Sequence, residues 1–324
     1  MQAILVGHRA AELLVRPSYS GSVMAVFSKA IYLSGNDGEI LWLAQAELPA
    51  HRRCVRVSAQ VDGLAPGMRF NAAAGVLNVG DVLLVDLVNV ARWRPRQVEP
   101  ELLPPVQVIN EVFWRTLSAI QRLPTVKGLA HTLTFIANPD GEGDYRQVSY
   151  AEKYWVELAM PIIRALIAAC YAQDLVRILR IGRELIGLGP GLTPSGDDYI
   201  GGLLFTAHQL EAAYSLEFIG ESERIRDFLN EARLSTNRIS HTILSDLADG
   251  HGPEPLHDLA HALLQRGTLP DALGSVGRLT QIGHTSGWDM LAGAMTGMLL
   301  KEAVAFQNPA FTQRAFRVAL HLRE

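Results

Sequence analysis

The chain has 324 residues, of which 48% are hydrophobic and 19% are charged, and its formal net charge is −4. This composition predicts a globular protein with a sizeable core, excludes disordered, collagen-like and coiled-coil classes, and offers no electrostatic basis for binding nucleic acid. We expect a cytoplasmic protein without a signal peptide or membrane span, because no basic-then-apolar start is present and Arg164 interrupts the most apolar stretch. Cys54 and Cys170 have no metal-binding or redox spacing and are predicted to be buried thiols.

The first hundred residues have the pattern of β structure. Four segments have strand-like patterns: 22–34, 39–48, 54–61 and 81–93. The first two flank Gly35-Asn36-Asp37-Gly38, a strong hairpin signal because these residue types tolerate positive φ. Prolines between 94 and 105 block both strand and helix and indicate a linker. We therefore predict an N-terminal antiparallel β domain, a small sheet or barrel, over residues 1–105.

After residue 106 the apolar residues recur at three- and four-residue spacing, which predicts helices. The expected helices are 107–122, 151–172, 174–187, 197–215, 221–233, 238–249, 255–266, 288–306 and 309–322. The stretch 124–150 is predicted to be a polar loop. The fold class is therefore α+β, with a larger and mainly helical domain over residues 106–324.

The most informative segment is GLGPGLTPSGDDYIGG, residues 187–202. Its glycines predict a tight loop with free backbone N–H groups, and Thr193 or Ser195 is expected to cap the helix that follows, with Asp198 as a capping-box partner. Such a loop at the positive end of a helix is a site for phosphate or carboxylate. The alternative is a well-capped turn between packed helices. No lysine follows the glycines, so the segment is not a nucleotide P-loop.

The pattern recurs in GHTSGWDMLAGA, residues 283–294. In both segments a Ser-Gly pair stands at the expected helix start, an Asp follows the Ser by three positions, and a Gly follows it by seven. Two helix starts facing one cavity would form an anion pocket lined by amides, hydroxyls and carboxylates. A third polar string, TNRIS at 236–240, offers Asn237, Arg238 and Ser240 to a carboxylate or amide. The alternative is that Ser235 or Thr236 only caps the helix that follows.

Together these strings resemble a bacterial family of formerly unassigned function that includes the AllH-type subunit of oxamate carbamoyltransferase. The opening β segment SGSVMAVFSKAIYLSGNDGEILWL is also similar to that family. The resemblance implies phosphorolysis of oxalurate to oxamate and carbamoyl phosphate in allantoin breakdown. It also implies two protein partners, one resembling the succinyl-CoA synthetase α subunit and one from a further family.

From these observations we predict a site for small anionic substrates. The expected catalytic residues are Asp197, Asp198, His284 and Asp289, with Asp198 as a candidate ligand for Mg²⁺. The expected binding residues are Gly189, Gly191, Thr193, Ser195, Gly196, Asn237, Arg238, Ser240, Thr285, Ser286 and Gly287. Two alternatives stay open: a non-catalytic anion-binding or structural subunit, and an acyl- or carbamoyl-transfer enzyme with another substrate.

Overall fold

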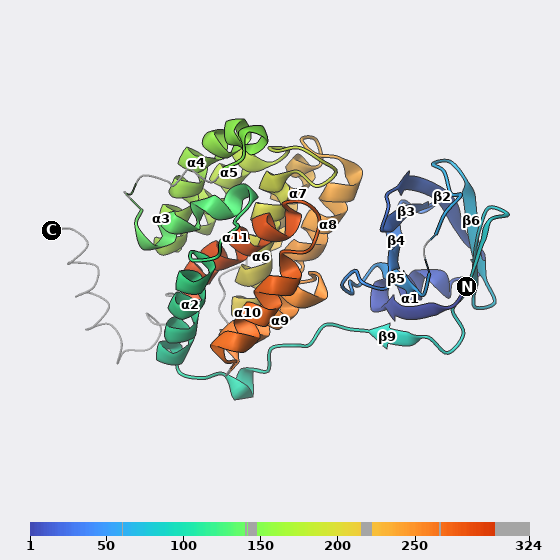
Figure 1. Ribbon diagram of the computed structural model, residues 1–324, viewed down its shortest axis with the longest axis horizontal. Helices are drawn as coiled ribbons and strands as arrows, with labels where there is room; N and C mark the ends of the chain where they lie inside the picture. The colour runs from blue at the N-terminus through green and yellow to red at the C-terminus, as the bar shows by residue number, and fades with distance from the viewer. Residues whose placement is uncertain (60, 140, 142–147, 215–221, 266, 302–324) are drawn as a thin grey trace. The chain divides into compact units, whose positions relative to one another are not determined.

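The computed structural model describes residues 1–301 except 60, 140, 142–147, 215–221 and 266 (Figure 1). The chain forms two compact units. The first contains Met1–Arg96 and His251–His257, and the second contains Gln97–Gly250 and the described residues from Asp258 onward. A sheet dominates the first unit and helices form the second, which confirms the predicted α+β class.

The first unit is built on a nine-stranded sheet with the order β8-β7-β6-β2-β3-β4-β5-β1-β9. Its strands are β1 (Ala3–Gly7), β2 (Tyr19–Val26), β3 (Ala30–Gly35), β4 (Ile40–Gln45), β5 (Cys54–Val57), β6 (Arg69–Ala73), β7 (Val76–Val79), β8 (Leu83–Asp86) and β9 (Ala91–Trp93). The sheet curls into a half-barrel because the chain start returns to β8. The amino group of Met1 donates to the Leu84 carbonyl at 2.7 Å, and Asp86 N–H donates to the Met1 carbonyl at 2.9 Å.

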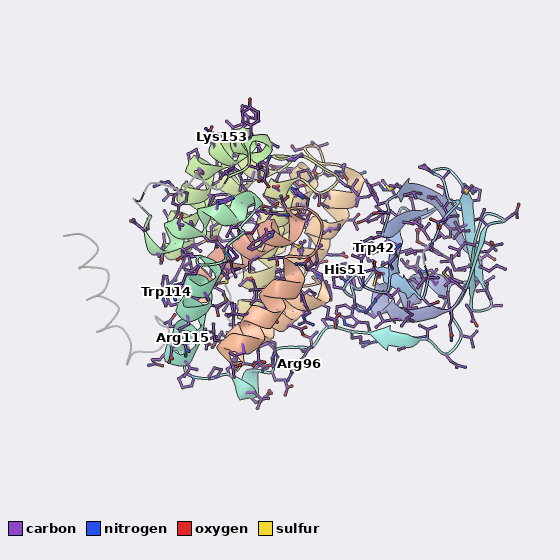
Figure 2. The ribbon with its side chains drawn as sticks, viewed as in Figure 1. Trp42, His51, Arg96, Trp114, Arg115 and Lys153 are labelled. Carbon is purple, nitrogen blue, oxygen red and sulfur yellow. The ribbon has the colours of Figure 1, made fainter. Side chains whose placement is uncertain are left out.

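Alternating burial along β2, β3 and β6 directs one face of the sheet into an apolar core, which also receives the helix α1 (His8–Leu14). The predicted hairpin at Gly35–Gly38 is present between β3 and β4. On the other face of β4, the rings of Trp42 and His51 lie 4.7 Å apart (Figure 2).

Two details of the predicted sheet are wrong. The single strand expected over 22–34 is two strands, β2 and β3, joined by a tight turn in which Phe27 N–H donates to the Ala30 carbonyl. The sheet is also not wholly antiparallel, because β4 pairs with β5 and β1 pairs with β9 in parallel. Strand direction depends on which strands become neighbours, and the alternation of side chains within one strand does not specify it.

The second unit is helical. Its α-helices are α2 (Val106–Ile120), α3 (Thr134–Ala137), α4 (Tyr150–Tyr171), α5 (Leu175–Gly182), α6 (Ser195–Tyr214), α7 (Ser222–Ala232), α8 (Arg238–Ala248), α10 (Leu269–Leu279) and α11 (Ser286–Gly297), and α9 (Glu254–Leu264) enters it from Asp258 onward. Short 3₁₀ turns occur at η1 (Pro100–Leu102), η2 (Gly128–Leu133), η4 (Arg183–Leu185) and η5 (Met298–Lys301).

Helices α6 and α11 lie against each other in the middle of this unit (Figure 1). Their glycines permit the contact. A Cβ on Gly202 would lie 2.2 Å from the Met290 carbonyl oxygen, and a Cβ on Gly293 would lie 1.8 Å from the Tyr199 carbonyl oxygen. The two backbones therefore approach each other through the glycines that stand seven positions after the serine of each Ser-Gly pair.

The helix predictions fail in three places. Residues 128–137, expected in a polar loop, form η2 and α3 and are largely buried. Helix α10 was not predicted, and the helix expected over 174–187 ends at Gly182. The helix expected over 309–322 lies outside the described residues.

Helix α4 is long and apolar enough to cross a membrane by length and composition, contrary to the expectation from Arg164. Half of its most apolar window is nevertheless buried inside the unit, where Val156, Ile163 and Cys170 have no exposed surface. Burial of this kind is typical of a core helix.

Candidate anion site and buried acid pair

Two loops lead directly into the central helices. In the loop before α6, Gly187, Gly189 and Gly191 have φ values of +81°, +110° and +99°, a region that favours glycine. Before α11, Gly283 has φ +62°. Ser195 and Ser286 are the first helical residues, so each stands at a helix start as expected, but Ser195 is not the cap of α6. The cap of α11 is Thr285, whose side chain makes no capping hydrogen bond.

The serine and threonine hydroxyl groups at the two helix starts instead connect one loop to the other. The Oγ1 of Thr193 lies 2.8 Å from the Oγ of Ser286, and the Oγ of Ser195 lies 3.4 Å from the Oγ1 of Thr285. Each helix start therefore contacts a threonine of the other loop.

The glycines that follow the two serines also match. A Cβ on Gly196 would lie 1.8 Å from the Leu185 carbonyl oxygen, and one on Gly287 would lie 1.9 Å from that of Leu279. The sequence repeat is thus a repeat in space, with the two loops facing each other.

Below the loops lies a pair of buried carboxylates, Asp198 and Asp289, which are 2% and 0% exposed. The backbone N–H of Leu129 donates to Oδ1 of Asp289 at 2.6 Å. The Oδ2 atoms of both residues are buried and have no hydrogen-bond partner among the described residues. Two buried acceptor oxygens without donors disfavour two negative charges.

Burial raises the pKa of both carboxyl groups. For Asp289 the pKa rises to about 7, although Leu129, Ser195 and Thr285 stabilise the charged form by hydrogen bonding. For Asp198 the pKa lies well above its ordinary value because of burial and then because of the negative charge of Asp289. The pair therefore carries a proton near neutral pH, and its titration belongs to both groups together.

No sequence pattern predicted the contact between η2 and Asp289. Gly128 has φ +55°, and a Cβ there would lie 2.3 Å from Oδ1 of Asp289. Its N–H donates to Glu152, whose second carboxylate oxygen accepts from the Ser149 hydroxyl at 2.7 Å. Because the contact to Asp289 uses a backbone amide, the only sequence signal was the isolated glycine.

Asp197 points away from the pair and joins three segments. Its Oδ1 accepts from Gly187 N–H at 2.7 Å, and its Oδ2 accepts from the hydroxyls of Thr236 and Ser240. Burial still raises its pKa, against these three hydrogen bonds. Both adjacent aspartates are thus buried, in different directions, and Asp197 together with Ser240 fixes the glycine loop to α8.

Asn237 also connects the glycine loop to α8. Its Oδ1 accepts from the N–H groups of Ile239 and Ser240 at 3.0 and 3.1 Å and caps α8, so the cap is Asn237 and not Ser235 or Thr236, the residues expected in that role. Its Nδ2 donates to the Leu192 carbonyl at 2.6 Å. Both the oxygen and the nitrogen of the Asn237 side-chain amide therefore make hydrogen bonds within the fold. Arg238, the first residue of α8, and His284, beside Thr285, are both exposed.

The structure thus brings the two loops, the acid pair and the TNRIS string into one place. The exposed residues of this place include Gly191, Asn237, Arg238 and His284, whereas Asp198 and Asp289 lie beneath it. In the part of the chain that the structure describes, no group of three or more His, Cys, Asp or Glu side chains is placed to hold a metal ion. The prediction of Mg²⁺ at Asp198 stays untested.

Residues 185–298 match the family described as oxamate carbamoyltransferase subunit AllH. The helical unit carries an AllH family segment. The AllH segment begins at Leu185, which contacts Gly196, and it includes both loops, the TNRIS string and both members of the acid pair. This match confirms the family resemblance carried by the two loops and the TNRIS string, whereas the opening β segment lies outside the matched residues. No solved structure matches the chain.

Proposed function

We propose that the protein is a subunit of a carbamoyltransferase that converts oxalurate and phosphate to oxamate and carbamoyl phosphate in allantoin breakdown. The observation that supports this most is the AllH match over the segment that contains both helix-start loops. The name of that family describes a subunit, so we propose that protein partners complete the enzyme. One partner is expected to resemble the succinyl-CoA synthetase α subunit, and the other to come from a further family.

Anion binding is assigned to the two loops. All reactants of this proposed reaction are small anions, and a helix N-terminus attracts negative charge through its free N–H groups and its dipole. Two such N-termini, those of α6 and α11, adjoin through the Thr193–Ser286 contact. The backbone from Gly189 to Gly191 is assigned to phosphate or carbamoyl phosphate, and Arg238 to a substrate carboxylate.

Proton transfer is assigned to the acid pair. In the proposed reaction a phosphate oxygen attacks the ureido carbonyl carbon of oxalurate, a C–O bond forms, and the C–N bond to the oxamate nitrogen then breaks. That nitrogen must gain a proton as it leaves. The raised pKa of Asp198 and Asp289 favours a protonated acid near neutral pH, and the partly exposed hydroxyls of Thr193 and Ser286 interact with Asp198. Hydroxyl groups in this position can relay the proton, and His284 offers an exposed alternative donor.

A matched pair of glycine substitutions tests the anion loop. Gly191 and Gly67 have φ values of +99° and +91°, and a Cβ at either position would meet no atom within 4 Å. The same backbone strain is therefore introduced by Gly191→Ala in the site and by Gly67→Ala in the β unit. In the complex reconstituted with its partners, we expect Gly191→Ala to slow carbamoyl phosphate formation about tenfold or more. Equal rates for the two variants would remove the loop from the mechanism.

The acid pair is tested by Asp198→Asn in the same assay. We expect the rate to fall by about 10²-fold, as for loss of a general acid. A second function, a non-catalytic anion-binding subunit, is favoured by the complete burial of Asp289. That alternative predicts an unchanged rate in Asp198→Asn, together with weaker phosphate binding to the isolated chain in Gly191→Ala than in Gly67→Ala.

A further inference from the structure

The β unit contains a cavity of its own, with a volume of about 370 Å³. It lies between the end of α1, the turn that joins β6 to β7, and the segment that joins β8 to β9. Its walls are mainly apolar and include Val6, Leu14, Leu87 and Val90. This volume is within the usual range for sites that bind small molecules. A substrate as small as oxamate would leave most of the space empty.

Among the described residues that line the cavity, the charged side chains are two arginines, Arg16 and Arg92. Arg92 belongs to β9 and pairs with Val6 of β1 in the parallel register. Paired residues of neighbouring strands lie on the same face of a sheet, so Arg92 leaves the sheet on the same face as Val6, which lines the cavity. Arg92 makes no hydrogen bond or ion pair within the described residues of this unit. It therefore supplies one uncompensated positive charge beside an apolar space.

Arg16 is held in position by its neighbours. Its guanidinium bonds to Asp37 at 2.7 Å and lies 5.9 Å from the ring centre of Tyr19. An arginine fixed in this way needs little reordering when a ligand arrives, although its charge is partly compensated by Asp37. No pattern in the sequence indicates this cavity.

The backbone at the rim is unusual. Among the described residues, four non-glycine residues have positive φ, and two of them line the cavity: Ser18 at 56° and Ala74 at 49°. A third, Asn89 at 59°, adjoins Val90. Ala74 and Gly75 form the two-residue turn between β6 and β7. Positive φ costs free energy at an alanine, and Asn or Gly would largely avoid that cost. The small side chain of Ala74 stands at the cavity edge despite it.

We propose that this cavity binds an organic anion with an apolar body, such as a medium-chain carboxylate. The apolar walls receive the chain of the ligand, and Arg92 pairs with its carboxylate. The proposal concerns the β unit only and does not depend on the carbamoyltransfer reaction.

Binding is tested on the full chain with octanoate and with 1-octanol, which has the same chain length and no charge. Titration is followed by amide chemical shifts and by calorimetry. We expect octanoate to bind more tightly than 1-octanol, with shifts at Val6, Leu14 and Leu87. Arg92→Gln is expected to weaken octanoate binding about tenfold and to leave 1-octanol unaffected. The control is Arg69→Gln, an exposed arginine of β6 that does not line the cavity.

A second substitution tests the space independently of the charge. Ala73 lines the cavity at the exposed end of β6, so Ala73→Leu is expected to fill part of the cavity without disturbing the core and to weaken both ligands. Circular dichroism and thermal unfolding establish that each variant is folded. Equal binding of octanoate and 1-octanol, equal loss in Arg92→Gln and Arg69→Gln, or unchanged binding in Ala73→Leu would each overturn the proposal.

Discussion

Asp289 illustrates how the surroundings of one residue decide its chemistry. Its carboxyl group has no exposed surface, receives one backbone hydrogen bond from Leu129, and interacts electrostatically with the second buried acid Asp198. In the unfolded chain the same group is solvated and titrates near 3.8, whereas burial raises the folded pKa to about 7. The folded state therefore retains a proton that the unfolded state has lost.

This difference predicts a pH-dependent stability. Between about pH 4 and 7 the folded chain binds more protons than the unfolded chain, so the contribution of this group to stability falls as the pH rises and is constant above the folded pKa. We expect Asp289→Asn to be more stable than the parent by roughly 1–3 kcal/mol at about pH 8, and to differ less at about pH 5. Urea unfolding of the variant and the parent at the two pH values measures this difference in stability.

The control for that experiment is Asp258→Asn, which removes a partly exposed carboxylate paired with Arg278 at 2.6 Å. Its effect on stability is expected to be small, about 1 kcal/mol or less, and similar at the two pH values. If Asp289→Asn showed the same pH-independent effect as the control, the acid pair would not hold a proton in the folded state.

Asn237 allows the helix cap and the loop contact to be separated. In Asn237→Asp the carboxylate still accepts from Ile239 and Ser240 N–H, whereas the donor to the Leu192 carbonyl is lost. We expect Asn237→Ala to lower stability by about 1 kcal/mol or more, and Asn237→Asp to lower it less. Amide exchange is expected to be faster around Leu192 in both variants. Unchanged exchange there would mean that the Leu192 hydrogen bond does not hold the loop.

At the scale of the elements, glycines set how closely α6 and α11 approach each other. Gly202 and Gly293 occupy equivalent positions in the two helices, and each lies against the backbone of the other helix. Small residues at a helix contact let the backbones approach closely, and the loops that precede the helices are brought together as a result. The geometry of the candidate site therefore depends on this packing.

Gly293→Ala and Gly277→Ala should have opposite effects. At Gly293 the new Cβ would lie 1.8 Å from the Tyr199 carbonyl oxygen, so we expect a loss of about 3 kcal/mol or more in stability, or no folded protein. At Gly277, inside α10, a Cβ meets nothing within 4 Å, and the higher helix propensity of alanine should add about 0.5–1 kcal/mol. Thermal and urea unfolding compare the two. A stable Gly293→Ala variant would contradict the close packing.

At the scale of the whole molecule, each compact unit contains one buried thiol. Cys54 lies on β5 in the first unit and Cys170 on α4 in the second, and both are free, as predicted. Burial raises the pKa of Cys54 to about 11 and raises that of Cys170 further. Since the thiolate is the reactive form, both thiols should be inert in the folded chain.

The two thiols therefore report on the two units separately. We expect iodoacetamide to label both at rates at least about 10²-fold below those of the unfolded chain at the same pH. Labelling in increasing urea, followed by peptide mass analysis, gives a midpoint for each unit. The variants Cys54→Ala and Cys170→Ala show which labelled peptide belongs to which thiol. Rapid labelling of either thiol without denaturant would contradict its burial.

The sequence by itself determined features that arise within a few residues. Helical periodicity located most of the helices, the Gly35–Gly38 turn located a hairpin, and the recurrence of Ser-Gly and Asp located the two helix starts. These patterns are local because turn conformation, capping and amphipathic spacing depend on near neighbours along the chain.

Only the tertiary structure decided which distant groups meet. Thr193 contacts Ser286 across 93 positions, and Leu129 donates to Asp289 across 160. The acid pair, its raised pKa and the curl of the sheet around Met1 all follow from such contacts. A local pattern specifies an element and the face it buries. The free energy that selects partners comes from packing and desolvation over the whole unit, which is why the sequence predicted the two loops and only the fold placed them over two buried acids.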